Sequence, residues 1–145
     1  MRSVVIGFGS TLRSDDGIGP RVAQRVARLA KSNEVRVLVR QVLTPDLAGD
    51  IHDVDRVVLI DASVQEAPGQ VREQWIKPQA FTSDAMVHAL QPGELLEWCR
   101  RTYGSSPEAV LITVGGRTFE VGEVLSLEVK QALPRLVKRT LDLLR

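Results

Sequence analysis

Cysteine is nearly absent from this chain of 145 residues, which contains only Cys99. A lone cysteine excludes an internal disulfide and any metal site built from several thiolates. Cys99 lies on an apolar helical stripe, so we interpret it as a small core residue. Stability must then come from apolar burial, and a chain of this length is large enough to bury a real core. We predict a single domain over residues 1–145.

The chain also has no large excess of either positive or negative charge. The 19 basic and 18 acidic residues leave a formal net charge of +1. This balance argues against nucleic acid as the main partner, because surfaces that bind nucleic acid depend on an excess of Lys and Arg. The locally basic stretches 21–31 and 135–145 follow helical patterns, and we interpret them as solvated helix faces.

Long hydrophobic runs are lacking as well. No apolar stretch approaches the roughly 20 residues that a membrane-spanning helix needs. No signal-peptide pattern opens the sequence. We therefore expect a cytoplasmic protein that acts without a membrane.

The common nucleotide and nucleophile motifs are absent too. No Gly-Lys-Ser/Thr of a Walker loop occurs, and Leu12 stands where a dinucleotide fingerprint starting at Gly7 needs its third glycine. The sequence also shows no Ser-His or Cys-His pair of the kind that activates a nucleophile. These gaps direct attention to carboxylates and histidine.

Apolar, β-branched runs alternate with helical patterns along the chain. Strands are predicted at 4–7, 35–42, 56–62, 70–76 and 109–114. Helices are predicted at 17–30, 45–51, in the segment that ends at 103, and from 126 to 145. The second strand is expected at an edge, the third at the centre, and the fourth antiparallel to the rest. This order predicts an α/β three-layer sandwich, with a mostly parallel twisted sheet of about five strands and helices on both faces.

A glycine-rich stretch with two adjacent acids follows the first predicted strand. Residues 7–19 read GFGSTLRSDDGIG. Gly7 and Gly9 permit a sharp turn out of the sheet. Asp15 and Asp16 then precede the first predicted helix, where one acid is enough to cap the helix and complement its dipole. The second acid therefore points to a function.

Several titratable residues are expected to meet at one edge of the sheet. Ligands of open α/β sheets bind beyond the carboxyl ends of the strands. Asp15 and Asp16 follow the first strand, Asp61 closes the third, and His88 lies in a loop before a helix, so we expect all four to face one crevice. Two carboxylates and an imidazole suit a divalent ion such as Ni²⁺, Zn²⁺ or Mn²⁺, and three protein ligands leave positions open.

Each of these residues also has a plainer explanation when it is taken alone. Asp16 could serve only as a helix N-cap, and Asp61 could serve only to start a turn. His88 could be an ordinary surface or core histidine. The predicted convergence of the three is what favours a site.

The motif over residues 7–19, followed by the strand that ends in Asp61 and then by His88, resembles the hydrogenase maturation proteases. These endopeptidases trim the C-terminal extension from the precursor of the [NiFe]-hydrogenase large subunit. The resemblance implies that Asp16, Asp61 and His88 bind nickel that the precursor already carries. It implies no permanently bound cofactor, and Cd²⁺ or Zn²⁺ is expected to substitute for nickel in vitro. The expected partner is the precursor, and the protein is expected to be a monomer.

The catalytic step has two open routes under this resemblance. Asp16 or Asp61 could act as general base for the attack of water, or the metal could polarise the scissile carbonyl. The sequence also departs from the family pattern in two places. Ser10 stands where the family often has Asn, and residues 41–46 read QVLTPD where it often has an Asp-Gly-Gly-Thr-like run. This form resembles the maturases of bidirectional, soluble hydrogenases.

Two other functions fit the residues without the resemblance. A stand-alone metallopeptidase or amidohydrolase would keep its own divalent ion. A flavodoxin-like domain would bind a small anionic ligand at the glycine-rich turn and the helix N-terminus. Asp15 and Asp16 argue against the flavodoxin-like domain, because two negative charges repel an anion at that position.

Overall fold

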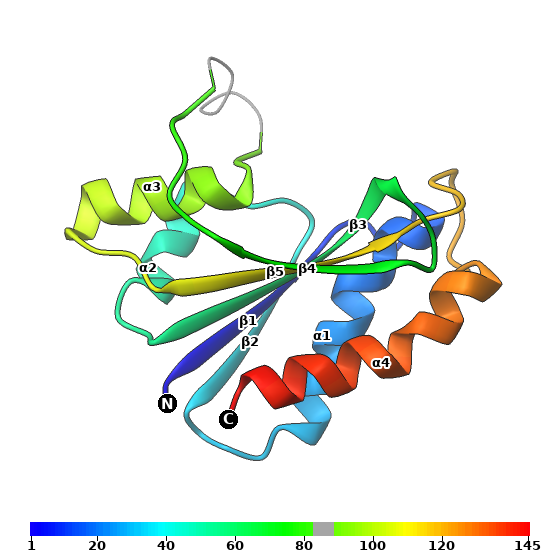
Figure 1. The fold of residues 1–145 in the computed structure, drawn as a ribbon, viewed down its shortest axis with the longest axis horizontal. Helices are drawn as coiled ribbons and strands as arrows, with labels where there is room; N and C mark the ends of the chain where they lie inside the picture. The colour runs from blue at the N-terminus through cyan, green and yellow to red at the C-terminus, as the bar shows by residue number, and fades with distance from the viewer. Residues whose placement is uncertain (83–88) are drawn as a thin grey trace.

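A computed structural model describes residues 1–82 and 89–145 of the chain. Within these residues, one five-stranded sheet has the strand order β2-β1-β3-β5-β4 (Figure 1). Its strands are β1 (Ser3–Phe8), β2 (Val35–Arg40), β3 (Arg56–Pro68), β4 (Val71–Ile76) and β5 (Glu108–Gly115). The first three and β5 pair in parallel, and β4 runs antiparallel to β5 at an edge. The predicted positions of the edge and central strands are confirmed.

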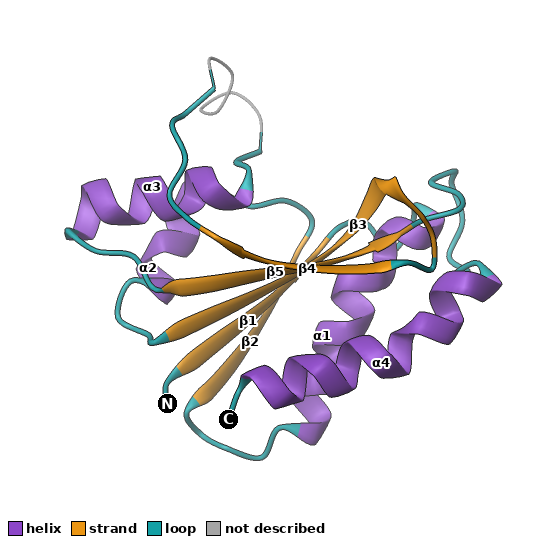
Figure 2. Ribbon diagram, viewed as in Figure 1, coloured by secondary structure: helices purple, strands orange, loops and turns teal. Residues whose placement is uncertain are grey.

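Helices cover both faces of this sheet, which confirms the three-layer sandwich (Figure 2). On one face lie α1 (Ile18–Leu29) and α4 (Leu127–Leu143), and on the other lie α2 (Ala48–Ile51) and α3 (Pro92–Tyr103). None of the helices in the described residues is long and apolar enough to cross a membrane. Helix α4 continues without interruption through Pro134.

The continuous apolar run of β3 reflects burial on both sides of the sheet. Successive side chains of a strand point to opposite faces. Val58 and Ile60 accordingly pack with α1 and α4, whereas Val57 and Leu59 pack with α2 and α3. Because all four side chains are fully buried, this strand forms the centre of both cores.

The third strand is longer than its sequence pattern predicts. Asp61 was expected to close the strand, but β3 continues to Pro68. The reason is that β5 keeps pairing with β3 as far as Ser63, whereas the pairing with β1 ends at Ile60. Asp61 is therefore the first residue of β3 beyond its pairing with β1.

Candidate active site

A pocket of about 250 Å³ lies where β1 and β2 end. It is bordered by the loops that leave these strands, by β3, and by the residues before α3. The lining residues are Phe8, Gly9, Asp16, Gln41, Val42, Leu43, Asp61, Ala89 and Leu90. The structure thus brings two of the predicted site residues, Asp16 and Asp61, to one hollow at the carboxyl end of the sheet.

Asp61 reaches this pocket because of its place in the alternation of β3. It follows Leu59 by two residues, so its side chain lies on the α2–α3 face. Its Oδ1 accepts a hydrogen bond of 2.8 Å from the backbone N–H of Ala62. Burial raises the pKa of Asp61 to about 7, the negative charge of Asp16 adds to the rise, and the Ala62 bond opposes it. The carboxylate is therefore poorly solvated.

Asp16 is fixed by the turn that leaves β1. The backbone N–H of Ser10 donates to Asp16 Oδ2 at 2.7 Å. The turn requires Gly9, whose φ is +136° and whose Cβ, if present, would lie 2.1 Å from the carbonyl oxygen of Asp16. A larger residue would push the segment that carries Asp16 out of position.

A second glycine brings helix α1 close to the sheet. A Cβ at Gly19 would lie 2.3 Å from the carbonyl oxygen of Ile60 and 2.7 Å from that of Phe8. The first turn of α1 therefore rests directly on the end of β1 and on the residue before Asp61. This close approach holds Asp16 beside Asp61.

Asp15 does not line the pocket, which corrects the expectation that it faces the same crevice. Its carboxylate is fully buried and accepts bonds from the backbone N–H groups of Arg117, Thr118 and Ser126 and from the Ser126 hydroxyl, at 2.7–3.2 Å. Burial alone would raise the pKa of Asp15, but these hydrogen bonds together lower it. Asp15 ties the turn to the loop between β5 and α4.

The two acids diverge because they lie in a 3-10 turn, η1 (Ser14–Gly17). Successive side chains of a 3-10 helix are about 120° apart. The turn starts at Ser14, whose φ of +53° is unusual for a residue with a side chain. Two hydrogen bonds stabilise this conformation. The Ser14 N–H donates to the Gly122 carbonyl at 2.8 Å, and the Ser14 hydroxyl donates to the Glu120 carbonyl at 2.7 Å. Neither acid caps α1, whose N-cap is Gly17.

His88, the third predicted ligand, lies outside the described residues. The next residue in the chain, Ala89, lines the pocket. Within residues 1–82 and 89–145, no group of three or more His, Cys, Asp or Glu side chains could hold a metal ion. The described part of the pocket offers two carboxylates, and the role of His88 stays a prediction.

One wall of the pocket was not singled out from the sequence. The N–H of Leu90 donates to the carbonyl of Leu43 at 3.0 Å and joins the segment before α3 to the loop after β2. Both leucines are almost fully buried and belong to the α2–α3 core. Their apolar character predicts burial, but nothing in the sequence links two residues so far apart.

Known proteins resemble this chain in sequence and in fold over nearly its whole length. No family model matches the chain. It is 26% identical to the hydrogenase 2 maturation protease of Escherichia coli (strain K12) over 151 aligned positions, which cover 100% of this chain and 92% of that protein. The structure also matches a hydrogenase 2 maturation peptidase from a Thaumarchaeota archaeon at a TM-score of 0.74, with 26% identity over 99% of this chain and 98% of that one.

Two further solved structures have the same fold. HycI of Thermococcus kodakarensis, a [NiFe] hydrogenase maturation protease, matches at a TM-score of 0.77 and 25% identity, over 97% of this chain and 90% of that one. The maturating endopeptidase HybD of Escherichia coli matches at 0.80 and 22% identity, over 100% of this chain and 93% of that one.

Proposed function

The chain belongs to the hydrogenase maturation protease family and is an endopeptidase, and from this premise we propose its substrate and mechanism. The proposed reaction removes the C-terminal extension from the nickel-loaded precursor of a [NiFe]-hydrogenase large subunit. The observation that carries the proposal is the pocket shared by Asp16 and Asp61. The site is expected at this edge of such a sheet, and its two carboxylates come from segments 45 residues apart in sequence.

Recognition of nickel follows from the donor chemistry of the pocket. Carboxylate oxygens, together with the predicted imidazole of His88, can occupy open coordination positions of a nickel ion that the precursor holds. The nickel ion is then part of the substrate, and the proposal requires no permanently bound cofactor. A precursor without nickel would lose these bonds, so it would dock poorly.

Hydrolysis needs a base for the attacking water, and we assign this role to Asp61. A general base must hold the proton that it takes, and without a metal ion burial raises the pKa of Asp61 to about 7, well above that of an ordinary carboxylate. Asp61 would take a proton as water attacks the scissile carbonyl carbon, and would return it to the amine as the C–N bond breaks. Asp16, anchored by the Ser10 N–H, would position nickel beside Asp61.

The experiment is to incubate the purified protein with nickel-loaded and nickel-free precursor and to detect the shortened product by mass spectrometry. We expect cleavage of the nickel-loaded form only. Asp61→Asn should lower the rate by about 100-fold or more, the scale of a lost acid–base group. Asp16→Asn and His88→Ala should also lower the rate, because each removes a ligand for the nickel ion. Asp142→Asn is the matched control, because Asp142 lies beside Leu143, whose carbonyl binds Arg56 at the opposite end of β3.

Other outcomes would contradict parts of this proposal. Cleavage that is indifferent to nickel, or that persists in Asp16→Asn and His88→Ala, would rule out nickel recognition by this pocket. A divalent ion held tightly and in stoichiometric amount after purification would favour the stand-alone metallopeptidase. Processing by Asp61→Asn at the wild-type rate would leave polarisation of the carbonyl by the metal as the surviving route.

A further inference from the structure

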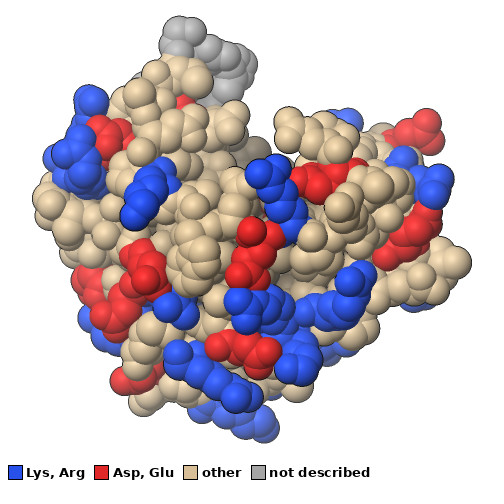
Figure 3. All heavy atoms as spheres, in the orientation of Figure 1, with Lys and Arg blue, Asp and Glu red and all other residues tan. Residues whose placement is uncertain are grey.

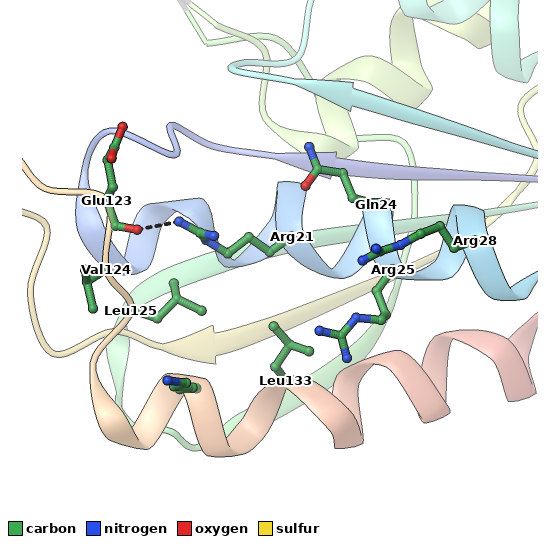
Figure 4. A pocket seen from close by; sticks show the side chains of 9 residues that line it. Arg21, Gln24, Arg25, Arg28, Glu123, Val124, Leu125 and Leu133 are labelled. Atoms are coloured by element: carbon green, nitrogen blue, oxygen red, sulfur yellow. Dashed lines mark hydrogen bonds between the residues drawn. The ribbon is translucent and has the colours of Figure 1, made fainter.

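A groove of about 510 Å³ separates α1, α4 and the loop before α4, apart from the pocket described above. Figure 4 shows Arg21 and Arg25 extending from α1 into it, with Leu125 and Leu133 facing them from the loop and α4. This volume lies within the roughly 300–1,000 Å³ typical of pockets that hold organic ligands. The groove can therefore hold several side chains of a partner.

Four cations line this groove. Arg21, Arg25 and Arg28 are spaced four and three residues apart, so they share one face of α1, and Lys130 joins them from α4. Among the residues that the structure describes, none of these four makes an ion pair, although many other arginines pair with carboxylates. Figure 3 shows blue and red surfaces mixed on the face it displays. The groove is therefore lined by four cations and one acidic residue, Glu123, in a chain whose net charge is only +1.

Arg21 has hydrogen-bonding capacity that the described residues leave unused. Its Nη2 donates to the backbone carbonyl of Glu123, which holds the guanidinium at the mouth of the groove. Its Nε is buried and has no partner among the described residues. A buried donor without an acceptor is unfavourable, and neighbouring like charges on a helix repel one another. An anionic partner in the groove would relieve the repulsion between the like charges.

The floor of the groove is apolar. Leu133 is 9% exposed and Leu125 is partly buried, and both pack with the α1–α4 core. A simple inorganic anion would pair with the cations but would leave these leucines uncovered. A partner that carries both carboxylates and an apolar side chain matches both parts of the lining.

We propose that this groove binds an acidic peptide segment of the protein that the enzyme processes, with its carboxylates on Arg21, Arg25, Arg28 and Lys130 and an apolar side chain on Leu125 and Leu133. The identity of the partner rests on the proposed function; the acidic and apolar character of the segment rests on the groove alone. A basic stretch that the sequence suggests is only a solvated helix face thus becomes a second contact for substrate.

The test measures binding of a fluorescein-labelled peptide that has four glutamates around one leucine, by fluorescence anisotropy. Arg25→Glu/Arg28→Glu should weaken binding by about tenfold or more, because it replaces two ion pairs with the peptide by two repulsive contacts. Lys31→Glu/Lys77→Glu is the control, because it changes the net charge equally with two exposed lysines outside the groove. We expect this control to bind within about twofold of the wild type, and we expect added salt to weaken wild-type binding.

Three results would overturn the inference: equal weakening by the lysine control, equal binding of a peptide with serine in place of leucine, or tighter binding of a single-stranded DNA oligonucleotide. The result is separable from the proposed function. Asp16→Asn should bind the acidic peptide like the wild type while failing to process the precursor. If the wild type processes no precursor, the peptide measurement still decides whether the groove is an acidic-peptide site.

Discussion

Asp15 and Asp61 are both carboxylates near the carboxyl end of the sheet, yet their surroundings are opposite. Asp15 accepts three backbone N–H bonds and a hydroxyl bond, and its pKa is lowered. Among the residues that the structure describes, Asp61 accepts one bond, from Ala62, and its pKa is raised to about 7. Asp61 lines a pocket, whereas Asp15 is fully buried against the loop before α4.

This difference separates a structural carboxylate from one that is free for chemistry. The oxygens of Asp15 are occupied by donors, so it can offer little to a ligand. Asp61 keeps acceptor capacity in a poorly solvated position, a state that a cation or a transferred proton would relieve. Asp16, adjacent to Asp15 in sequence, lies with Asp61 in the pocket. The hydrogen-bond donors around each acid therefore determine its role more than its position in the sequence does.

The largest effect on stability is expected at Asp15. Asp15→Ala would leave three backbone N–H groups without their acceptor, and we expect it to lower the free energy of unfolding by about 4 kcal/mol. Urea unfolding followed by circular dichroism at pH 7 measures the loss. The control is Asp55→Ala, because the exposed Asp55 accepts one bond, from the N–H of Arg2, and its loss should cost about 1 kcal/mol. A loss below about 1 kcal/mol for Asp15→Ala would contradict its structural role.

The pH dependence of stability should have opposite signs at the two acids. The folded protein keeps the Asp61 proton that the unfolded chain releases between pH 3.8 and about 7, so this group lowers stability as pH rises across that window. Asp61→Asn should therefore raise the free energy of unfolding at pH 8 by up to about 4 kcal/mol, because each unit of pKa difference corresponds to about 1.4 kcal/mol. At pH 4 the same substitution should change the free energy of unfolding little. Asp15 stabilises above its ordinary pKa of 3.8, and this contribution is lost as pH falls through its lowered pKa.

Urea titrations of both proteins at several pH values test the Asp61 prediction. An equal difference between wild type and Asp61→Asn at pH 4 and pH 8 would show that Asp61 has no raised pKa. Asp16→Asn sharpens the test: removing the neighbouring charge should move the transition to lower pH.

A smaller effect on stability, but a large one on activity, is expected at Gly9. In Gly9→Ala the new Cβ would meet the Asp16 carbonyl oxygen, so we expect a loss of about 2 kcal/mol and a strong drop in precursor processing. Gly104→Ala is a matched control. Gly104 also has a positive φ, of +86°, but nothing lies within 4 Å of its Cβ position. It should lose about 1 kcal/mol and process normally; equal processing by both variants would argue against the role of Gly9.

The sheet was predictable because its strands carry local signals of burial. The uninterrupted apolar run before Asp61 indicated a central strand, and the alternation of Val35, Arg36 and Val37 indicated an edge. The end of β3 was not predictable, since its last residues pair only with β5, which comes more than 40 residues later. The meeting of Asp16 with Asp61 followed from the rule for open α/β sheets rather than from either residue alone.

The structural role of Asp15 could not be predicted from the residues next to it in the sequence. Its donors lie 102 to 111 residues away in the sequence, in the loop that precedes α4. The left-handed conformation of Ser14 is likewise held by bonds to Glu120 and Gly122. A pair of acids before a helix predicts capping, and only the tertiary contacts assign one acid to the scaffold and the other to the pocket.

The smallest expected effect isolates one donor of the Asp15 cluster. Ser126→Ala removes the hydroxyl that donates to Asp15 at 2.8 Å but keeps the backbone N–H that donates at 2.7 Å. We expect a loss of about 1 kcal/mol in the free energy of unfolding, because three donors still satisfy the carboxylate. Precursor processing should be unchanged, since Ser126 lies outside the pocket. Ser32→Ala, which removes an exposed hydroxyl that accepts from the Glu34 N–H, should change stability by less than about 0.5 kcal/mol. If Ser126→Ala instead impaired processing while leaving stability unchanged, Asp15 would have to act in the chemistry, and the division between the two acids would fail.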